Sequence, residues 1–400
     1  MKRLLDLFRR DPAPRAEGGL SLTSPELYAL IVDALGQRTT QSGLTVTPKV
    51  ALRNPAVLRS VSLISFAVGQ LPLHLIRMAD RTKERDHPLF KILHRRPNPW
   101  QTSFEFRALM QQRALTQGSA YARIIRSRGN VVALVPIASV MPRQRDDWRL
   151  EYVVSNRDGS RIVLPQSEVF HVRFGLSDDG ITGLSLVQQA AEAIALAMQT
   201  ERAAANLFRR GVMAGLVLET KGQVTPEAFE RLKASLDERE GAENAHRTII
   251  LEEGMTLNAA PTTGRDAQAL EQRAHQIEEI GRVFGVPRPL LGMADTSWGS
   301  GIAELGQMFV LYGLNPWFEA WEQAVARDLL TDAGADELEA KFNAGALLRG
   351  NMKDQSEFFA RGLGSGGHHP WLEIDEVREF MDLPEARNLP PMPGQKETRQ

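Results

Sequence analysis

The sequence contains no cysteine, no long hydrophobic run and no strong excess of either charge. Without cysteine the chain forms neither disulfides nor a cysteine-based metal site, which fits a reducing cytoplasm. Its 48 Lys and Arg residues nearly balance its 49 Asp and Glu residues, so the chain as a whole has no bias toward polyanions. With 400 residues, 42% of them hydrophobic, it is long enough for two or three packed units.

Membrane-spanning and ATP-binding signatures are also missing from the sequence. The most apolar window, residues 61–76, is short and contains Gln70, Pro72 and His74, so no segment is expected to span a bilayer. Charged residues interrupt the N-terminal stretch before the apolar core of a signal peptide can form. The GxxxxGK[ST] phosphate cradle does not occur, so energy for any mechanical work would have to come from a partner.

Two predicted helices, over 225–240 and 265–285, are the features around which the rest of the chain is organised. A polar insert, 241–264, separates them. Apolar residues recur every seven positions in the second helix, at Leu270, Ile277 and Phe284. Such a narrow seam favours a neighbouring helix over a broad core. Residues 225–285 carry twelve Asp or Glu against seven Lys or Arg, so the segment is acidic and does not resemble a nucleic-acid clamp.

Strands precede this helical pair and a long helix follows it. Short apolar runs separated by turn residues predict one small antiparallel sheet, with strands at 120–127, 131–136, 150–155, 160–164 and 168–173. Helical spacing predicts a long helix over 184–210 and another over 302–330. The second contains Asn315–Pro316, where the missing proline amide hydrogen predicts a kink.

Two motifs suggest chemistry but have simpler structural explanations. The GxGxxG pattern at 362–367 follows a polar helix instead of a strand, so a flexible joint is expected there in place of a dinucleotide site. Asp178, Asp179 and His171 form the candidate metal site of a soluble hydrolase. A turn for the two aspartates and a packed, hydrogen-bonded histidine explain the same residues.

Nine segments occur in a fixed order between residues 50 and 382. They are AVLRSVSLISFAVGQLPLHLI, HPLFKILHRRPNPWQTSFEF, GSAYARIIR, EVFHVRF, GITGLSLVQQA, FRRGVMAGLVL, NAHRTIILEEGM, DAQALEQRAHQIEEIGRVFGVPRPLLG and EIDEVREFMDLP. In this order they resemble the tailed-bacteriophage portal family of the long, non-contractile-tail type, which also occurs in gene transfer agents. The sequence departs from the family pattern at GGHHPW and in the loop at 295–301.

The resemblance implies an α+β fold: a portal fold with an α/β wing, a two-helix stem, a small clip insert, a long kinked helix and a short helical C-terminal crown. The implied boundaries are a flexible N-terminal arm at 1–45, the wing at 46–223, stem helices at 224–240 and 266–289, the clip at 241–265, a tunnel loop at 290–301, the long kinked helix at 302–330, the crown at 331–388 and a disordered tail at 389–400.

The resemblance also implies the function and the partners. The chain would form a ring, typically a dodecamer, at one capsid vertex of a virion, through which double-stranded DNA is packaged and later ejected. Further implied partners are the large terminase, the head–tail adaptor and the major capsid protein, with assembly in the host bacterial cytoplasm and no membrane. No catalytic residue, cofactor or metal is expected.

Three groups of residues are expected to carry this function. Acidic stem side chains would let the negatively charged duplex slide: Glu227, Glu230, Asp237, Glu238, Glu271, Glu278 and Glu279. The tunnel loop is expected to gate the duplex sterically through Asp295, Thr296, Ser297 and Trp298, although burial of Trp298 in the core is equally open. The clip is expected to contact the terminase and then the adaptor through Glu243, Asn244, His246 and Arg247.

Two other classes of protein remain open. One is a metal-dependent soluble hydrolase around Asp178, Asp179 and His171, which metal binding by the monomer would favour. The other is a different virion connector or scaffold protein. A ring with a central hole favours the portal over the hydrolase, and its position at a unique vertex separates the portal from other connectors.

Overall fold

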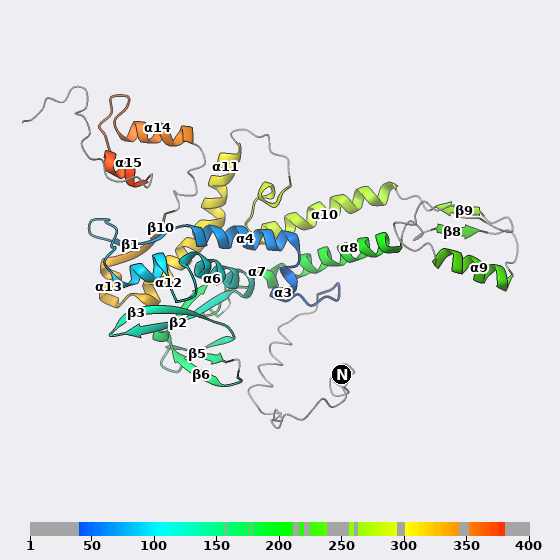
Figure 1. Cartoon of the computed structure of the whole chain (residues 1–400), viewed down its shortest axis with the longest axis horizontal. Coiled ribbons are helices and arrows are strands. Elements are labelled where there is room, and N and C mark those ends of the chain that lie inside the picture. The colour runs from blue at the N-terminus through cyan, green and yellow to red at the C-terminus, as the bar shows by residue number, and fades with distance from the viewer. Residues whose placement is uncertain are drawn as a thin grey trace, which may run out of the picture. The chain divides into compact units, whose positions relative to one another are not determined.

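The computed structural model describes residues 40–156, 158–175, 177, 179–210, 216–219, 225–237, 256–259, 263–293, 301–343 and 352–380. These residues belong to two units, whose helices and strands are drawn in Figure 1. The first unit comprises Met1–Arg59 and Ser185–Val283, and the second comprises Ser60–Leu184 and Phe284–Gln400. Within the described ranges, no helix has the length and apolar character needed to cross a membrane.

Long helices dominate the first unit. Its elements are α3 (Pro48–Ala51), α7 (Leu186–Gln189), α8 (Ala191–Arg210), β8 (Leu216–Glu219), α9 (Pro226–Asp237), β9 (Thr256–Ala259) and α10 (Thr263–Phe284). The Gln188 amide donates to the carbonyl of Val46 (3.0 Å), and the Gln199 amide donates to that of Ser42 (3.2 Å). Ser42, within the arm predicted over residues 1–45, is therefore hydrogen-bonded to α8, and Val46, directly after that arm, is hydrogen-bonded to α7.

The second unit contains most of the strands. Its N-terminal part, Ser60–Leu184, contains most of α4 (Pro55–Gln70, which begins in the first unit), β1 (Leu73–Arg77), α5 (Pro88–Phe90), the π-helix η1 (Lys91–Arg95), α6 (Ser103–Gln117), β2 (Ser119–Ser127), β3 (Asn130–Ile137), β4 (Val140–Gln144), β5 (Leu150–Ser155), β6 (Arg161–Pro165), the 3-10 helix η2 (Gln166–Glu168) and β7 (Val169–Arg173). Its C-terminal part, Phe284–Gln400, contains the 3-10 helix η5 (Arg288–Leu291), α11 (Gly301–Met308), the π-helix η6 (Phe309–Leu314), α12 (Asn315–Leu329), α13 (Asp332–Glu337), β10 (Leu338–Phe342), α14 (Met352–Gly362) and α15 (Ile374–Phe380).

Six of these strands form two antiparallel sheets, with the orders β3-β2-β7 and β4-β5-β6. All five strands predicted from the sequence are present, but they do not form the single sheet that was expected. The additional strand, β4, contains Pro142, which is tolerated because β4 lies at a sheet edge. Buried side chains from both sheets pack in one cluster: Tyr121, Tyr152, Val154, Leu164 and Val169.

Strand β10 pairs with β1, so that Leu73 lies opposite Phe342. Residues 338–342, which fall in the crown predicted over 331–388, therefore form a two-stranded sheet with β1. Buried residues alternate along β10, at Leu338, Ala340 and Phe342. The boundary of the crown stays a prediction.

The helix predicted over 302–330 is divided into three segments. The π-helix η6 follows α11, and α12 begins at Asn315 with Pro316 in its first turn. Because proline donates no backbone hydrogen bond and its ring crowds the preceding turn, the change of helix type falls directly before it. The change of helix type thus falls at Asn315–Pro316, where the sequence predicted a kink.

Helix α12 supplies much of the core of the second unit. Trp321 is 1% exposed and packs on Phe170 of β7, with ring centroids 5.8 Å apart. Its indole N–H donates to the Gln111 side chain of α6 at 2.8 Å. Phe318 packs on Phe342 of β10, with centroids 5.0 Å apart. One helix thus holds α6 and two separate sheets together.

Arg107 of α6 caps the C-terminal end of α4. Its guanidinium donates to the carbonyls of Val68 (3.2 Å), Gly69 (2.7 Å), Leu71 (3.0 Å) and Leu93 (2.7 Å). The last carbonyls of a helix have no intrahelical donor, and this side chain provides one. Burial lowers the pKa of Arg107 to about 10, so the guanidinium remains charged at neutral pH.

Candidate functional site

The candidate channel element is the pair of helices α8 and α10 of the first unit. The Gln276 amide on α10 donates to the Thr200 hydroxyl on α8 at 3.2 Å, and Arg273 forms an ion pair with Glu201 at 3.7 Å. Figure 1 shows the two helices running alongside each other. Gln276 is 5% exposed, whereas Glu271 is exposed. One face of α10 is therefore covered by the chain itself, and another is open to a further molecule.

This pairing differs from the hairpin expected between 225–240 and 265–285. Strand β8 precedes α9 and pairs with β9 after it, with Leu216 opposite Ala259. Helix α9 therefore lies within an insertion that these two strands close, and the polar contacts from α10 described above reach α8. The predicted partner of α10 was wrong because a seven-residue apolar repeat shows that a helix packs against another helix but does not show which one.

The predicted stem carboxylates are divided between two helices. Helix α9 carries Glu227, Glu230 and Asp237, and α10 carries Glu271, Glu278 and Glu279. The guanidinium of Arg282 forms an ion pair with Glu279 at 2.5 Å. Together α8 and α10 contain six Asp or Glu and six Arg residues, so the pair is balanced in charge. Of the five excess negative charges of residues 225–285, four thus come from the segment between β8 and α10.

The remaining predicted site residues lie outside the described residues. They are Glu238, the clip residues Glu243, Asn244, His246 and Arg247, and the tunnel-loop residues Asp295, Thr296, Ser297 and Trp298. The described chain defines where the tunnel loop is attached: it follows η5 and precedes α11. The roles of these residues stay predictions.

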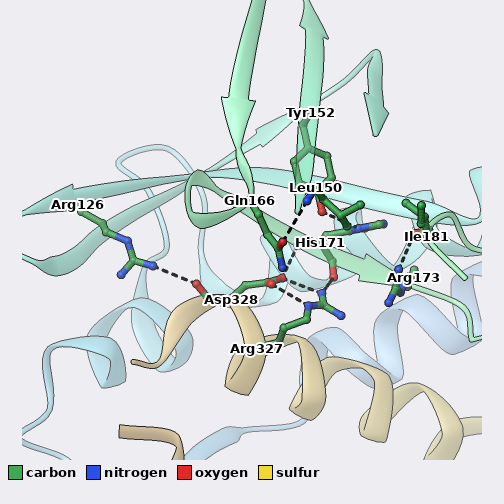
Figure 2. A network of polar contacts seen from close by, with 9 residues as sticks. All are labelled: Arg126, Leu150, Tyr152, Gln166, His171, Arg173, Ile181, Arg327 and Asp328. Carbon is green, nitrogen blue, oxygen red and sulfur yellow. Dashed lines mark hydrogen bonds and ion pairs between the residues drawn. The ribbon is translucent and has the colours of Figure 1, made fainter. Parts of the chain in front are cut away.

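A buried polar network surrounds His171 of β7, as Figure 2 shows. Its Nδ1 lies 3.2 Å from the Tyr152 hydroxyl, and its Nε2 lies 3.1 Å from the Ser119 hydroxyl. Burial, followed by the positive charges of Arg327 and Arg173, lowers the pKa of His171 to about 3, so its ring is neutral at neutral pH. The packed, hydrogen-bonded histidine predicted from the sequence is confirmed.

The backbone of His171 is held by the end of α12. Its amide donates to Asp328 Oδ2 at 2.9 Å, and its carbonyl accepts from Arg327 (Figure 2). Arg327 and Asp328 also bind each other at 2.8 Å. Because β7 lies at the edge of its sheet, these side chains occupy backbone groups that another strand could otherwise pair with. The network has a structural explanation that requires no catalysis.

Asp179 of the candidate metal site closes a turn. Its carboxylate accepts from the amides of Ile181 and Thr182 and from the Thr182 hydroxyl, each at 2.8 Å. Asp178 lies outside the described residues. In the part of the chain that the structure describes, no three His, Asp or Glu side chains are grouped so as to hold a metal ion. The turn predicted for this motif accounts for Asp179.

The GxGxxG pattern begins at the last residue of α14 and continues into turns, with positive φ at Gly364, Gly366 and Gly367. A dinucleotide fingerprint requires a strand before the first glycine and a helix behind the loop. A helix precedes this pattern, so its structural context is that of a joint between α14 and the following segment.

Comparison with known proteins identifies the family. The family profile described as "Phage portal protein" matches residues 55–382. The chain is 30% identical to the portal protein of Enterobacteria phage HK97 over 351 residues, covering 86% of this chain and 80% of that protein. It is also 30% identical to the probable portal protein of Streptomyces phage phiC31 over 394 residues, covering 94% of this chain and 84% of that protein.

Solved structures share the fold. A chain in the virion of a native gene transfer agent particle matches with a TM-score of 0.60 at 22% identity, covering 89% of this chain and 99% of that chain. The crystal structure of an HK97 family phage portal protein from Corynebacterium diphtheriae matches with a TM-score of 0.54 at 20% identity, covering 78% of this chain and 98% of that chain. The sequence match and the shared fold lead to one conclusion: this chain belongs to the phage portal protein family.

Proposed function

We propose that this chain forms a homo-oligomeric ring at a unique capsid vertex and serves as the channel through which DNA is packaged and ejected. The observation that carries the proposal is the family match over residues 55–382, which spans both units of the fold. A chain from the neck of a native gene transfer agent particle, computed with C12 symmetry, has the same fold (TM-score 0.55), which supports a dodecamer. The role is structural and not catalytic.

Exposed apolar side chains on α11 and η6 supply a contact for ring formation. Met308, Leu311 and Tyr312 are 54%, 54% and 72% exposed. Their spacing of three and four residues places them along one helical face. A strip of this kind is stabilised by burial against another surface. When the same contact repeats around an axis, the subunits close into a ring.

The stem in this proposal consists of α8 and α10. Their hydrogen bond and ion pair support this assignment in place of the helix at 225–240. The clip then lies in the insertion that contains β8, α9 and β9. Its residues Glu243, Asn244, His246 and Arg247 contact the large terminase during packaging and the head–tail adaptor afterwards. Parts of the ring outside the stem and clip contact the major capsid protein.

Carboxylates of the stem reduce adhesion of the duplex to the channel wall. Duplex DNA carries about one negative charge per 1.7 Å of its axis, and cationic walls would bind it by counterion release. Glu271 and Glu278 are seven residues apart on one face of α10. Replacing both by Lys should increase retention of DNA in filled particles. DNA retention equal to that of the unmodified particle would contradict this role.

The tunnel loop narrows the channel next to the stem. Asp295, Thr296, Ser297 and Trp298 contact the duplex sterically, because a large apolar indole in a polar loop is stabilised when it meets another surface. Deletion of these four residues should reduce the amount of DNA retained after packaging. Packaging and retention that remain unaltered would exclude a gating role.

Native mass spectrometry of the purified full chain tests the ring itself. The chain has a mass of 44.4 kDa, and a dodecamer has about twelve times that mass. A closed complex near this mass supports the proposal. A monomer at all concentrations tested would overturn it and would reopen the question of a soluble enzyme.

A further inference from the structure

A groove in the second unit is lined by an excess of cations. It has a volume of about 1400 Å³, and its walls come from the segment between β1 and α6 and from the turn between β2 and β3. Six Lys or Arg residues line it: Lys83, Arg85, Lys91, Arg95, Arg96 and Arg128. Asp86 is the one carboxylate among the described residues of the lining, which leaves a formal excess of five positive charges. We call this feature the cationic groove.

The charged groups outnumber the exposed apolar ones in the cationic groove. Lys91, Arg95 and Arg128 are exposed. Of the aliphatic lining residues, Ile92 and Val131 are 5% and 6% exposed, and Val132 is 47% exposed. A bound molecule would therefore meet several cations and one exposed aliphatic side chain.

The wall that carries Lys91 and Arg95 is rigidly supported. These residues lie on the π-helix η1. π-Helices are rare in proteins, and those that occur are often found at functional sites. The carbonyl of His94 accepts from the Ser103 hydroxyl at 2.9 Å. The His94 ring stacks on His74 and Phe90, with centroids 5.5 and 4.9 Å away. The cations of η1 are thus presented from a fixed position.

The field in the groove is positive before anything binds. Burial lowers the pKa of His94, and the charges of Arg107, Arg95, Arg85 and Lys83 lower it further. Like charges held together in this way oppose one another, so an anion that enters the groove removes an unfavourable interaction. This arrangement favours a polyanion as the occupant.

Arg128 stands at a backbone position that its side chain disfavours. Ser127 pairs with Asn130, and the two residues between them, Arg128 and Gly129, have φ values of +50° and +85°. Such two-residue hairpin turns are normally occupied by Asn, Asp or Gly at the first position. An Arg held there is unfavourable for folding, and an unfavourable conformation that persists points to use of the side chain for binding.

We propose that the cationic groove, whose lining includes no residue of α8 or α10, binds the phosphate backbone of duplex DNA without sequence specificity. Four of its six cations are Arg, whose planar fork matches phosphate oxygens. Its volume exceeds the roughly 300–1000 Å³ of most small-molecule sites, and its cations lie on two walls, as an extended polyanion requires. The inference rests on the proposed function only for the source of the DNA, which is the genome inside the capsid.

Filter binding of the full chain to a covalently closed DNA minicircle tests the proposal, because a closed circle cannot thread a preformed ring. The test variants are Arg128→Asn and the pair Lys91→Gln with Arg95→Gln. The matched control replaces two exposed cations of the same unit, Arg145 and Arg161, by Gln. At 0.1 M salt, each lost phosphate contact should weaken binding roughly eightfold and reduce the slope of log K against log salt by about 0.9.

Arg128→Asn separates binding from folding. Because Asn suits a positive φ, this variant should unfold at the same temperature as the original chain or a higher one, and still bind DNA more weakly. If both test variants bind the minicircle as tightly as the control variant does, the proposal is wrong. If poly-glutamate of equal total charge displaces the minicircle as well as free duplex does, the groove is a site for acidic protein and the proposal is also wrong.

The same samples distinguish failure of this inference from failure of the proposed function. Groove-dependent binding by a chain that forms no ring overturns the proposed function and leaves the groove assignment intact. Rings whose minicircle binding is insensitive to Lys91, Arg95 and Arg128 overturn the groove assignment alone.

Discussion

Gly118 and Gly183 meet backbone to backbone in the second unit. A Cβ atom on Gly118 would lie 2.0 Å from the carbonyl oxygen of Gly183, and one on Gly183 would lie 1.9 Å from that of Gly118. Gly118 also has a φ of +87°. The amide of Gly183 donates to the Ser119 hydroxyl at 2.9 Å, so this contact borders the network around His171.

Replacing either glycine by Ala should destabilise the fold. Both substitutions force backbone atoms apart, and Gly118→Ala also places a side chain at a positive φ, so each should lower the free energy of unfolding by about 2–4 kcal/mol. Chemical denaturation measures this change. The control is Gly175→Ala, where a Cβ meets nothing within 4 Å, with an expected change within about 0.5 kcal/mol. Similar stabilities for all three variants would contradict the close contact.

His171 should make stability depend on pH. Its pKa is about 3 in the folded chain against a normal value of 6.5. Because the folded pKa is lowered, the unfolded chain binds the proton first, so this contribution is complete above pH 6.5 and is lost as pH falls toward 3. The slope reaches about 1.4 kcal/mol per pH unit.

His171→Gln keeps a neutral hydrogen-bonding side chain and should remove that slope between pH 6.5 and 5, where most carboxylates remain ionised. Denaturation at several pH values provides the comparison. The control is His369→Gln, which makes the same substitution at an exposed histidine. A slope retained in His171→Gln would show that another group titrates in this range.

Arg107 should contribute strongly to the stability of the second unit. Arg107→Met leaves four carbonyl groups without their charged donor and should cost about 3 kcal/mol or more, while Arg107→Lys should cost less because it keeps one donor group. Urea denaturation ranks the two variants. If Met and Lys have the same small effect, the capping role of the guanidinium is wrong.

The exposed strip on α11 and η6 should be required for assembly. Leu311→Ser with Tyr312→Ser removes apolar surface from the proposed contact, so rings should dissociate at protein concentrations about tenfold higher or more, with folding retained. Mass photometry across a dilution series measures this shift. Trp148→Ser, at a side chain that is 82% exposed elsewhere in the second unit, serves as the control. Equal dissociation in both variants would place the subunit contact on another surface.

Local sequence patterns predicted where helices and strands form better than they predicted which of these elements pack or pair with one another. Alternating apolar residues located β2, β3, β5, β6 and β7, because one face of each strand is buried. The pairing of β1 with β10 was missed, since Leu73 and Phe342 are far apart in sequence and the run Leu338–Phe342 is short. Strand β4 was missed because Pro142 is normally evidence against a strand.

The same limit applies to the candidate sites. The apolar seam on α10 indicated that this helix needs a helical partner. The alanine-rich sequence of α8 could have identified that partner, because small side chains permit close approach of two helices, but the prediction paired α10 with the helix at 225–240 instead. The cationic groove was visible as the basic run from Lys83 to Arg96. The sequence did not show that Arg128 lines the same groove, because the turn between β2 and β3 lies beside the basic run only in the folded chain.

Electron cryomicroscopy of the purified chain would show whether α8 and α10 line a channel. We expect a closed ring of about twelve copies around an open hole, with α8 and α10 of every subunit bordering that hole. A particle in which those two helices are enclosed within a single subunit, or a ring whose hole is bordered by other elements, would contradict it.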